Sequence, residues 1–300
     1  MSSVDYREDV RISENILQQM SDAYRRIRNT ARFLMGNLSD FNYSEDKVDY
    51  NDMFEIDRWA MHKLEELKEK TTKYYDRYEF YSLFQEITYF CSIEMSSFYL
   101  DIVKDRLYCE NKKSPERRSA QTVLTEVLRV LVRVISPVLS FTAEEIWERI
   151  PESIKEEESV HLSSWIEANP EYKNEELAKK WEKIYHLRKE VNKKLEAERQ
   201  TGMIGHSLDA KVLLNISNDE YAFLKEYTET EVSDLFIISQ VKFVNDKLQE
   251  SEIEGITIAV EKASGEKCER CWKYDEEVGH DHEHNDVCPR CAKVLNSLEK

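Results

Sequence analysis

Apolar residues recur at intervals of three and four over most of the first half of the chain, which is the spacing of one face of an α-helix. Ser13, a residue type that caps helix N-termini, predicts the start of the first helix, with Glu14 in its first turn. The apolar stripe of that helix comprises Ile16, Leu17, Met20, Tyr24, Ile27, Ala31 and Leu34. Further helices are predicted over residues 52–70, 77–109 and 115–135.

The helix over 115–135 is apolar nearly all round and is therefore expected to be central. Pro137 ends it, because proline cannot continue the hydrogen-bond pattern of a helix. Thr142 followed three residues later by Glu145 is a capping-box pattern, which predicts that another helix begins there. Four or five long helices joined by short turns make a helix bundle.

The stretch 151–175 is acidic and irregular, which indicates a boundary in the chain. A further helix is predicted over residues 174–199, and Gly202 suits a left-handed cap at its C-terminus. The buried stripe of that helix comprises Leu177, Trp181, Ile184, Leu187, Val191 and Leu195.

The hydrophobic period then changes to two, the period of a β-strand. The alternating positions are Leu208, Ala210, Val212, Leu214 and Ile216. Two more strands are predicted within "LFIISQVKFV" (235–244) and "GITIAVE" (255–261). A helix with a small α/β unit is therefore expected over residues 166–260.

Composition supports a mainly helical protein, because 300 residues contain only 6 Gly and 5 Pro. The N-terminus carries no apolar signal-peptide core, and no run of about 18 apolar residues could cross a bilayer. We therefore expect a cytoplasmic protein with reduced cysteines, in which paired Cys-x-x-Cys units indicate a metal before a disulfide. Cys91 and Cys109 have no such partners and are expected to be buried, inert thiols.

The formal net charge of −17 argues against nucleic-acid binding, but local patches decide contacts. Residues 112–133 carry a local charge of +4, and residues 23–39 contain arginines and no acid. Arg25, Arg28 and Arg32 lie three and four positions apart, so they share one helix face. A solvated charged face is the common explanation of such a pattern, whereas the missing acids favour a phosphate-binding face.

Two Cys-x-x-Cys units near the C-terminus, Cys268/Cys271 and Cys288/Cys291, are separated by 16 residues. This spacing is typical of a zinc site, and four thiolates leave no open coordination position, so the zinc is expected to be structural. A thioredoxin-like redox role would instead require one such unit ahead of a helix in a larger α/β domain. His280, His282 and His284 are assigned to a flexible polar loop, because four cysteines already complete the ligand set.

Trp272 follows a zinc ligand directly and has two possible roles. In so small a unit it would serve as the hydrophobic core. Beside Arg270 and Lys273, on a metal-held turn, it would also suit stacking on an unpaired base. The sequence leaves both roles open.

Several segments resemble a known family. "RISENILQQMSDAYRRIRNTARFLMGNLSDF", "SSFYLDIVKDRLY", "RRSAQTVLTEVL" and "SPVLSFTAEEIW" are similar to the anticodon-binding helical domain of class I aminoacyl-tRNA synthetases. "ERQTGMIGHSLDAKV" resembles the junction that follows this domain, and "GEKCERCWKY…CPRCAKVL" resembles the C-terminal zinc finger of bacterial isoleucyl-tRNA synthetases. The resemblance covers essentially the whole chain in family order.

The family's adenylation motifs, of the His-x-Gly-His and Lys-Met-Ser-Lys-Ser types, do not occur in the sequence, and neither does the inserted editing domain. The resemblance therefore implies an excised C-terminal third of a ligase, with no catalytic residue of its own. We expect such a fragment to be inactive alone, since ATP would be used only by the full-length enzyme.

The fold that the resemblance implies is a helical anticodon-binding domain over 1–165, a junction domain over 166–260 and a four-cysteine zinc finger over 261–300. Its implied partners are isoleucine tRNA and the catalytic domain of the full-length chain, and the protein is expected to be a monomer. The implied tRNA-binding residues are Arg270 and Trp272 at the wobble end of the anticodon, Arg11 at the hinge with the catalytic domain, and, on charge grounds, Arg25, Arg28 and Arg32.

Two other classes compete with this interpretation. A zinc-dependent hydrolase would need a histidine–carboxylate set with an open metal position, and the sequence shows none. A helical protein-interaction scaffold with a zinc ribbon accounts for the acidity more easily.

Overall fold

The computed structural model describes residues 4–7, 9, 12–246 and 248–298. Its described part is mainly helical with a small mixed sheet, as the sequence predicts. Arg11, the predicted hinge residue, lies outside the described residues.

The chain divides by its contacts into two compact units. The first comprises Met1–Leu107 and Lys112–Ala178, and the second comprises Tyr108–Asn111 and Lys179–Lys300. The short segment Tyr108–Asn111 therefore belongs with residues far along the chain, which sequence periodicity does not indicate.

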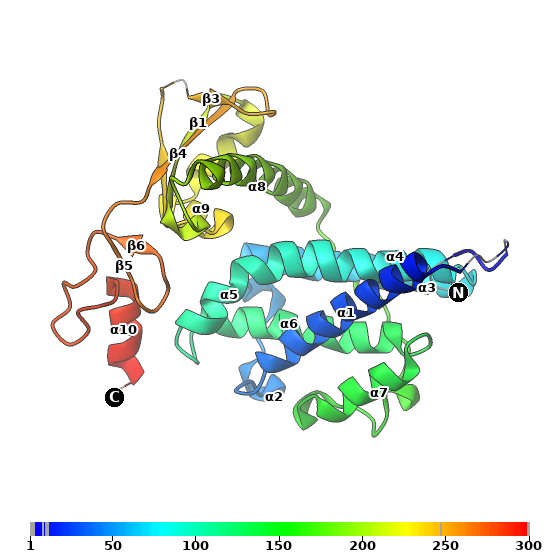
Figure 1. The fold of residues 1–300 in the computed structure, drawn as a ribbon. Helices are drawn as coiled ribbons and strands as arrows, with labels where there is room; N and C mark the ends of the chain where they lie inside the picture. Colours follow the sequence, from blue (N-terminus) through cyan, green and yellow to red (C-terminus); the bar gives the residue numbers. More distant parts are fainter. Residues whose placement is uncertain (1–3, 8, 10–11, 247, 299–300) are drawn as a thin grey trace. The chain divides into compact units, whose positions relative to one another are not determined.

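Helix α6 is the centre of the first unit (Figure 1). Helices α1, α3 and α7 all contact it, and 15 of its 21 residues are buried, so the predicted central position is confirmed. Besides the long helical run over residues 80–109, the helices of this bundle are α1 (Glu14–Gly36), α2 (Tyr43–Asp46), α3 (Glu55–Asp76), α6 (Pro115–Ile135) and α7 (Ser140–Arg149).

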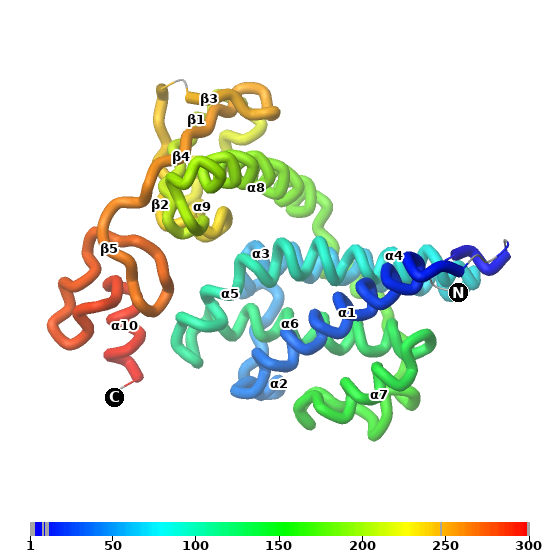
Figure 2. The backbone as a smooth tube through the Cα atoms, viewed as in Figure 1, coloured from blue at the N-terminus to red at the C-terminus, as the bar shows by residue number. Residues whose placement is uncertain are grey.

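The predicted helix over 77–109 is one continuous helical run, which Figure 2 shows as a single tube. It consists of α4 (Phe80–Tyr89), a π-helix (Phe90–Tyr99) and α5 (Leu100–Cys109). A π-helix turns more widely than an α-helix. Its buried side chains are Phe90, Cys91, Met95, Phe98 and Tyr99.

The predicted caps have different outcomes. Ser13 caps α1 as expected, because its Oγ accepts the Ile16 N–H at 3.3 Å. The predicted capping box at Thr142 is wrong, since α7 begins two residues earlier and its N-cap, Leu139, makes no side-chain cap. Thr142 Oγ1 instead lies 3.2 Å from the hydroxyl of Tyr24, so it links α7 to α1.

The acidic stretch after α7 is fixed on α3 by side chains that accept its backbone N–H groups. Glu65 accepts the Asn169 N–H at 2.7 Å, and the Nδ1 atom of His62 accepts the Asn174 N–H at 2.9 Å. The Tyr172 ring stacks on Tyr50 with centroids 4.8 Å apart. These contacts place the stretch in the first unit.

Helix α8 (Glu175–Thr201) leads into the second unit and ends as predicted. Gly202 has φ +79°, a left-handed conformation that glycine adopts without a Cβ clash. The N–H groups of Gly202 and Met203 donate to the Arg199 and Glu198 carbonyls, which closes the helix end.

A four-stranded sheet with the order β2-β1-β4-β3 follows α8. Its strands are β1 (Ala210–Ile216), β2 (Gln240–Phe243), β3 (Gln249–Glu250) and β4 (Ile256–Lys262), and only the β1–β2 pair is parallel. The predictions for β1 and β4 are confirmed.

The prediction of a strand over 235–244 is confirmed only for its second half, which contains β2. Its first half is wrong, because α9 (Glu229–Phe236) occupies the start of the segment. Thr228 and Glu231 form a capping box at the N-terminus of α9, and Ile237, at φ +56°, closes the helix in the left-handed conformation. Tertiary packing and the cap override the strand propensity of "LFII".

Candidate functional site

The four predicted zinc ligands, Cys268, Cys271, Cys288 and Cys291, are brought together, with sulfur atoms all within 4.8 Å of one another. The first pair lies between the short strands β5 (Glu266–Lys267) and β6 (Tyr274–Asp275). The second pair lies at the start of α10 (Pro289–Leu298). We call residues 265–298 the zinc knob.

Backbone hydrogen bonds shape the first Cys-x-x-Cys turn for metal binding. The Cys268 carbonyl accepts the Trp272 N–H at 2.9 Å, and the Cys268 N–H donates to the Lys273 carbonyl at 2.9 Å. Gly265 enters the turn at φ +88°, where a Cβ would lie 2.3 Å from the Asp275 carbonyl. Only glycine therefore fits at this close approach.

The sulfur geometry fits a tetrahedral zinc ion. A tetrahedron with Zn–S bonds of about 2.3 Å has S···S edges of about 3.8 Å, and the Cys271 and Cys288 sulfurs lie 3.8 Å apart. Hydrogen bonds from the Cys271 and Cys291 thiols lower the pKa of Cys288, while hydrogen bonds with Cys271 and Cys288, together with burial, raise the pKa of Cys291. Ionising all four thiols therefore requires a cation among them, and four thiolates leave it no open position.

The buried core of the zinc knob consists mainly of the ligands themselves. Around them pack Val278, Val287, Ala292 and Leu295. Trp272 is not part of this cluster, and its side chain is 59% exposed. The interpretation of Trp272 as the hydrophobic core of the unit is therefore not the arrangement found.

Trp272 also has an unusual backbone, with φ +65° in the left-handed region. This conformation costs a residue with a Cβ roughly 1–2 kcal/mol, and glycine or asparagine adopts it more readily. The Nζ atom of Lys267 lies 5.4 Å from the centre of the indole ring. The turn thus holds an aromatic ring in solvent beside a cation.

Arg270, between the first two ligands, makes a contact that the sequence does not predict. Its guanidinium donates to the carbonyl of Cys109, and the Cys109 thiol lies 3.8 Å from the Arg270 carbonyl. Cys109 and Cys91 are both buried, as predicted, and burial raises the pKa of the Cys91 thiol to about 12.

The predicted arginine face of α1 is present, and Arg25, Arg28 and Arg32 are all exposed. Arg25 forms an ion pair of 2.9 Å with Asp22, an acid just outside the acid-free stretch counted in the sequence. Among the described residues, no acid lies within ion-pair distance of Arg28 or Arg32.

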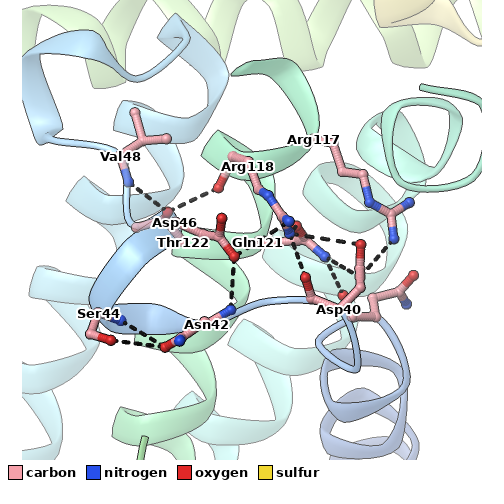
Figure 3. A network of polar contacts seen from close by, with 10 residues as sticks. Asp40, Asn42, Ser44, Asp46, Val48, Arg117, Arg118, Gln121 and Thr122 are labelled. Carbon is pink, nitrogen blue, oxygen red and sulfur yellow. Dashed lines mark hydrogen bonds and ion pairs between the residues drawn. The ribbon is translucent and has the colours of Figure 1, made fainter. Parts of the chain in front are cut away.

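The basic run at the start of α6 is neutralised inside the bundle (Figure 3). Arg117 lies 2.9 Å from Asp40, and Arg118 pairs with Asp46 at 3.3 Å and donates to the Asp40 carbonyl at 2.8 Å. Burial pushes the pKa of Asp40 upward, but hydrogen bonds and charges from Arg117, Gln121 and Arg118 outweigh burial and lower it. These arginines hold the chain between α1 and α2 against α6.

The later arginines of α6 are also engaged. Arg129 and Arg133 both pair with Glu156, and the Arg133 Nη2 atom lies 2.6 Å from its carboxylate. The local charge of +4 over residues 112–133 therefore supplies little free positive surface along α6.

The histidine-containing loop is turned by Asp281, which accepts the N–H groups of Glu283 and His284. In the part of the chain that the structure describes, the four cysteines form the one cluster suited to a metal. None of the helices formed by the described residues is long and apolar enough to cross a membrane.

Two families match the chain. Residues 57–214 match the family described as "Anticodon-binding domain of tRNA ligase", and residues 265–294 match "Zinc finger found in FPG and IleRS". The first match covers most of the bundle with α8 and β1, and the second covers the four-cysteine cluster.

Curated relatives named "Isoleucine--tRNA ligase" align along nearly the whole chain. Those from Kosmotoga olearia, Geobacter sulfurreducens and Petrotoga mobilis are 48%, 49% and 50% identical, each over 98% of this chain. The chain spans about a third (32%) of the length of these relatives. It therefore belongs to the anticodon-binding domain family of tRNA ligases and matches the C-terminal region of isoleucine--tRNA ligases.

Proposed function

We propose that this chain is the tRNA-binding part of an isoleucine--tRNA ligase, which grips the anticodon stem-loop of isoleucine tRNA. In the whole enzyme a separate catalytic domain would join isoleucine to that tRNA with ATP. The names of the relatives and the two family matches support this proposal. We further propose that the protein acts as a monomer in the cytoplasm, with division of the chain at residues 165 and 260.

The observation that carries the proposal is the exposed indole of Trp272. An aromatic ring that is 59% in solvent contributes little to the core, yet the turn keeps it at an unfavourable φ of +65°. Such local strain persists where function needs the side chain. Aromatic side chains beside cations stack on unpaired bases, which an anticodon loop offers.

The proposed roles of the arginines follow from their surroundings. Arg28 and Arg32 are exposed and suit phosphate contacts, whereas Arg25 must exchange its Asp22 partner for a phosphate. Arg270 uses one N–H on the Cys109 carbonyl, and a guanidinium has four more to offer. Arg11 stays a predicted hinge residue.

A gel shift that compares isoleucine tRNA with another tRNA, at two salt concentrations, tests the proposal. We expect preferential binding of isoleucine tRNA that weakens steeply as salt rises, since phosphate contacts release counterions. A protein-interaction scaffold would show no tRNA binding at any salt concentration, and that result would overturn the proposal.

We expect no isoleucine-dependent ATP–pyrophosphate exchange by the 300-residue chain, because it lacks the adenylation motifs of the family. Exchange that persisted through clean purification would place an active site within these residues.

A further inference from the structure

The segment Tyr108–Asn111 is fixed to the zinc knob through three consecutive residues. The Arg270 guanidinium donates to the Cys109 carbonyl, Arg290 Nη1 lies 3.4 Å from Glu110 Oε1, and Asn111 Nδ2 donates to Ser297 Oγ at 2.8 Å. These contacts explain why the segment belongs to the second unit.

Tyr108, the first residue of this segment, presents its ring to solvent. Its side chain is 58% exposed, which is close to the 59% of Trp272. Arg270 joins the two, because it holds the carbonyl of the residue after Tyr108 and lies two positions before Trp272. One guanidinium therefore ties the backbone after Tyr108 to the turn that carries Trp272.

A single exposed tyrosine needs no explanation. Here, however, the backbone that carries the ring is anchored at the next three residues, so little ordering entropy remains to be lost when the ring binds a ligand. Two exposed aromatic rings, one next to backbone held by Arg270 and the other beside Lys267, form a combination that suits unpaired nucleotides, since bases stack on rings and cations attract the phosphate backbone.

We propose that Tyr108 is a second base-stacking residue of the RNA-binding surface that carries Trp272, and that Arg270 is its positioning residue. This inference rests on the proposed tRNA binding and adds a contact from the end of α5. The ligand class is single-stranded RNA in the loop of the tRNA.

The test measures the binding of an isoleucine tRNA transcript to the 300-residue chain with Tyr108→Ala and Tyr108→Phe. Loss of a stacking contact should weaken binding about 5- to 150-fold in Tyr108→Ala, with an unchanged salt slope because no phosphate contact is lost. Tyr108→Phe retains the ring and should bind within about twofold of the parent chain. Tyr89→Ala is the matched control, because Tyr89 is 51% exposed on the same helical run.

The role of Arg270 is tested by a double-mutant cycle. If Arg270 positions Tyr108, the Tyr108→Ala change should cost less in an Arg270→Ala background than in the parent chain. Full additivity of the two changes would overturn the positioning role.

The outcomes separate this inference from the function on which it rests. Normal binding by Tyr108→Ala, together with weak binding by Trp272→Ala, would overturn the inference and leave the proposed function standing. Normal binding by both variants would overturn the inference and remove the main support for the proposed function. Loss of zinc from Tyr108→Ala would show a structural role and would also overturn the inference.

Discussion

The helix bundle and the zinc knob are stabilised in opposite ways. The bundle buries large side chains such as Trp147, Tyr99, Phe90 and Leu131 almost completely. The knob buries three of its four cysteines with a few apolar residues and half-buries Cys271, and its only tryptophan is exposed to solvent. Burial of apolar surface is enough for a bundle of this size, whereas a unit of about 35 residues needs a metal.

The two regions also differ in where their polar side chains act. Most arginines of α6 neutralise carboxylates within the bundle, so they specify the fold. In the knob the metal maintains the fold, and Trp272 stays exposed to solvent, where the proposed recognition of tRNA needs it. The difference shows that a metal allows a very small unit to expose the side chains that a larger core would bury.

Zinc removal should produce the largest effect, and only in the knob. Structural zinc contributes on the order of 10–16 kcal/mol of binding free energy to small units, so chelation should unfold residues 265–298. The helical circular dichroism of the bundle should persist. Hydrogen exchange and elemental analysis of the same sample would measure this, and Cys268→Ser should behave like the chelated protein. Full exchange protection of the knob without metal would contradict the comparison.

A cavity in the bundle should destabilise the bundle and leave the zinc knob intact, which is the converse of zinc removal. Leu131→Ala removes a fully buried side chain from α6 and should reduce the free energy of unfolding of the bundle by about 2–5 kcal/mol. Zinc content should not change. Leu17→Ala is the control, because Leu17 is 56% exposed on α1 and should cost little. Loss of zinc from Leu131→Ala would show that the two regions fold as one cooperative unit.

Replacement of Trp272 should affect recognition without unfolding the knob. Trp272→Ala should weaken tRNA binding by about 1–3 kcal/mol and leave the salt slope nearly unchanged. Trp272→Gly should lose the same binding energy but retain zinc at least as well, because glycine relieves the left-handed backbone at φ +65°. Zinc retention and tRNA affinity should be measured on both proteins. Weak zinc retention in the glycine variant would show that Trp272 stabilises the knob.

Much of the fold could be predicted because its causes are local. The bounds of α6, the cap at Ser13, the turn at Gly202 and the four zinc ligands each depend on a few neighbouring residues. Strand propensity gives the wrong element where a helix cap competes with it. The cap at Thr228 starts α9, and this helix continues into the start of "LFIISQVKFV".

The long-range pairs could not be predicted, because nothing near them in sequence records the partner. The neutralisation of Arg118 by Asp40 and Asp46 depends on how α6 packs against the chain that follows α1. The contact between Arg270 and Cys109 joins residues 161 positions apart. Counting charges within a stretch of sequence therefore overestimates the exposed positive charge of α6. It also gives no sign that the segment beginning at Tyr108 contacts the zinc knob.

The smallest predicted effect distinguishes a surface arginine from a structural one. Arg28, on α1, has no acidic partner among the described residues, so Arg28→Ala should leave stability within about 0.5 kcal/mol of the parent chain. If it meets one phosphate, its loss should lower the salt slope of tRNA binding by about one unit and weaken all tRNAs alike.

Arg118, whose side chain is 11% exposed, provides the matched comparison. Arg118→Ala should cost about 1–3 kcal/mol of bundle stability, because Asp40 and Asp46 lose a partner that donates hydrogen bonds. The salt slope of tRNA binding by Arg118→Ala should equal that of the parent chain. Thermal unfolding and tRNA titrations at three salt concentrations measure both quantities on both variants. A lower slope in Arg118→Ala with unchanged stability would mean that the basic run of α6, despite its internal partners, contacts the RNA.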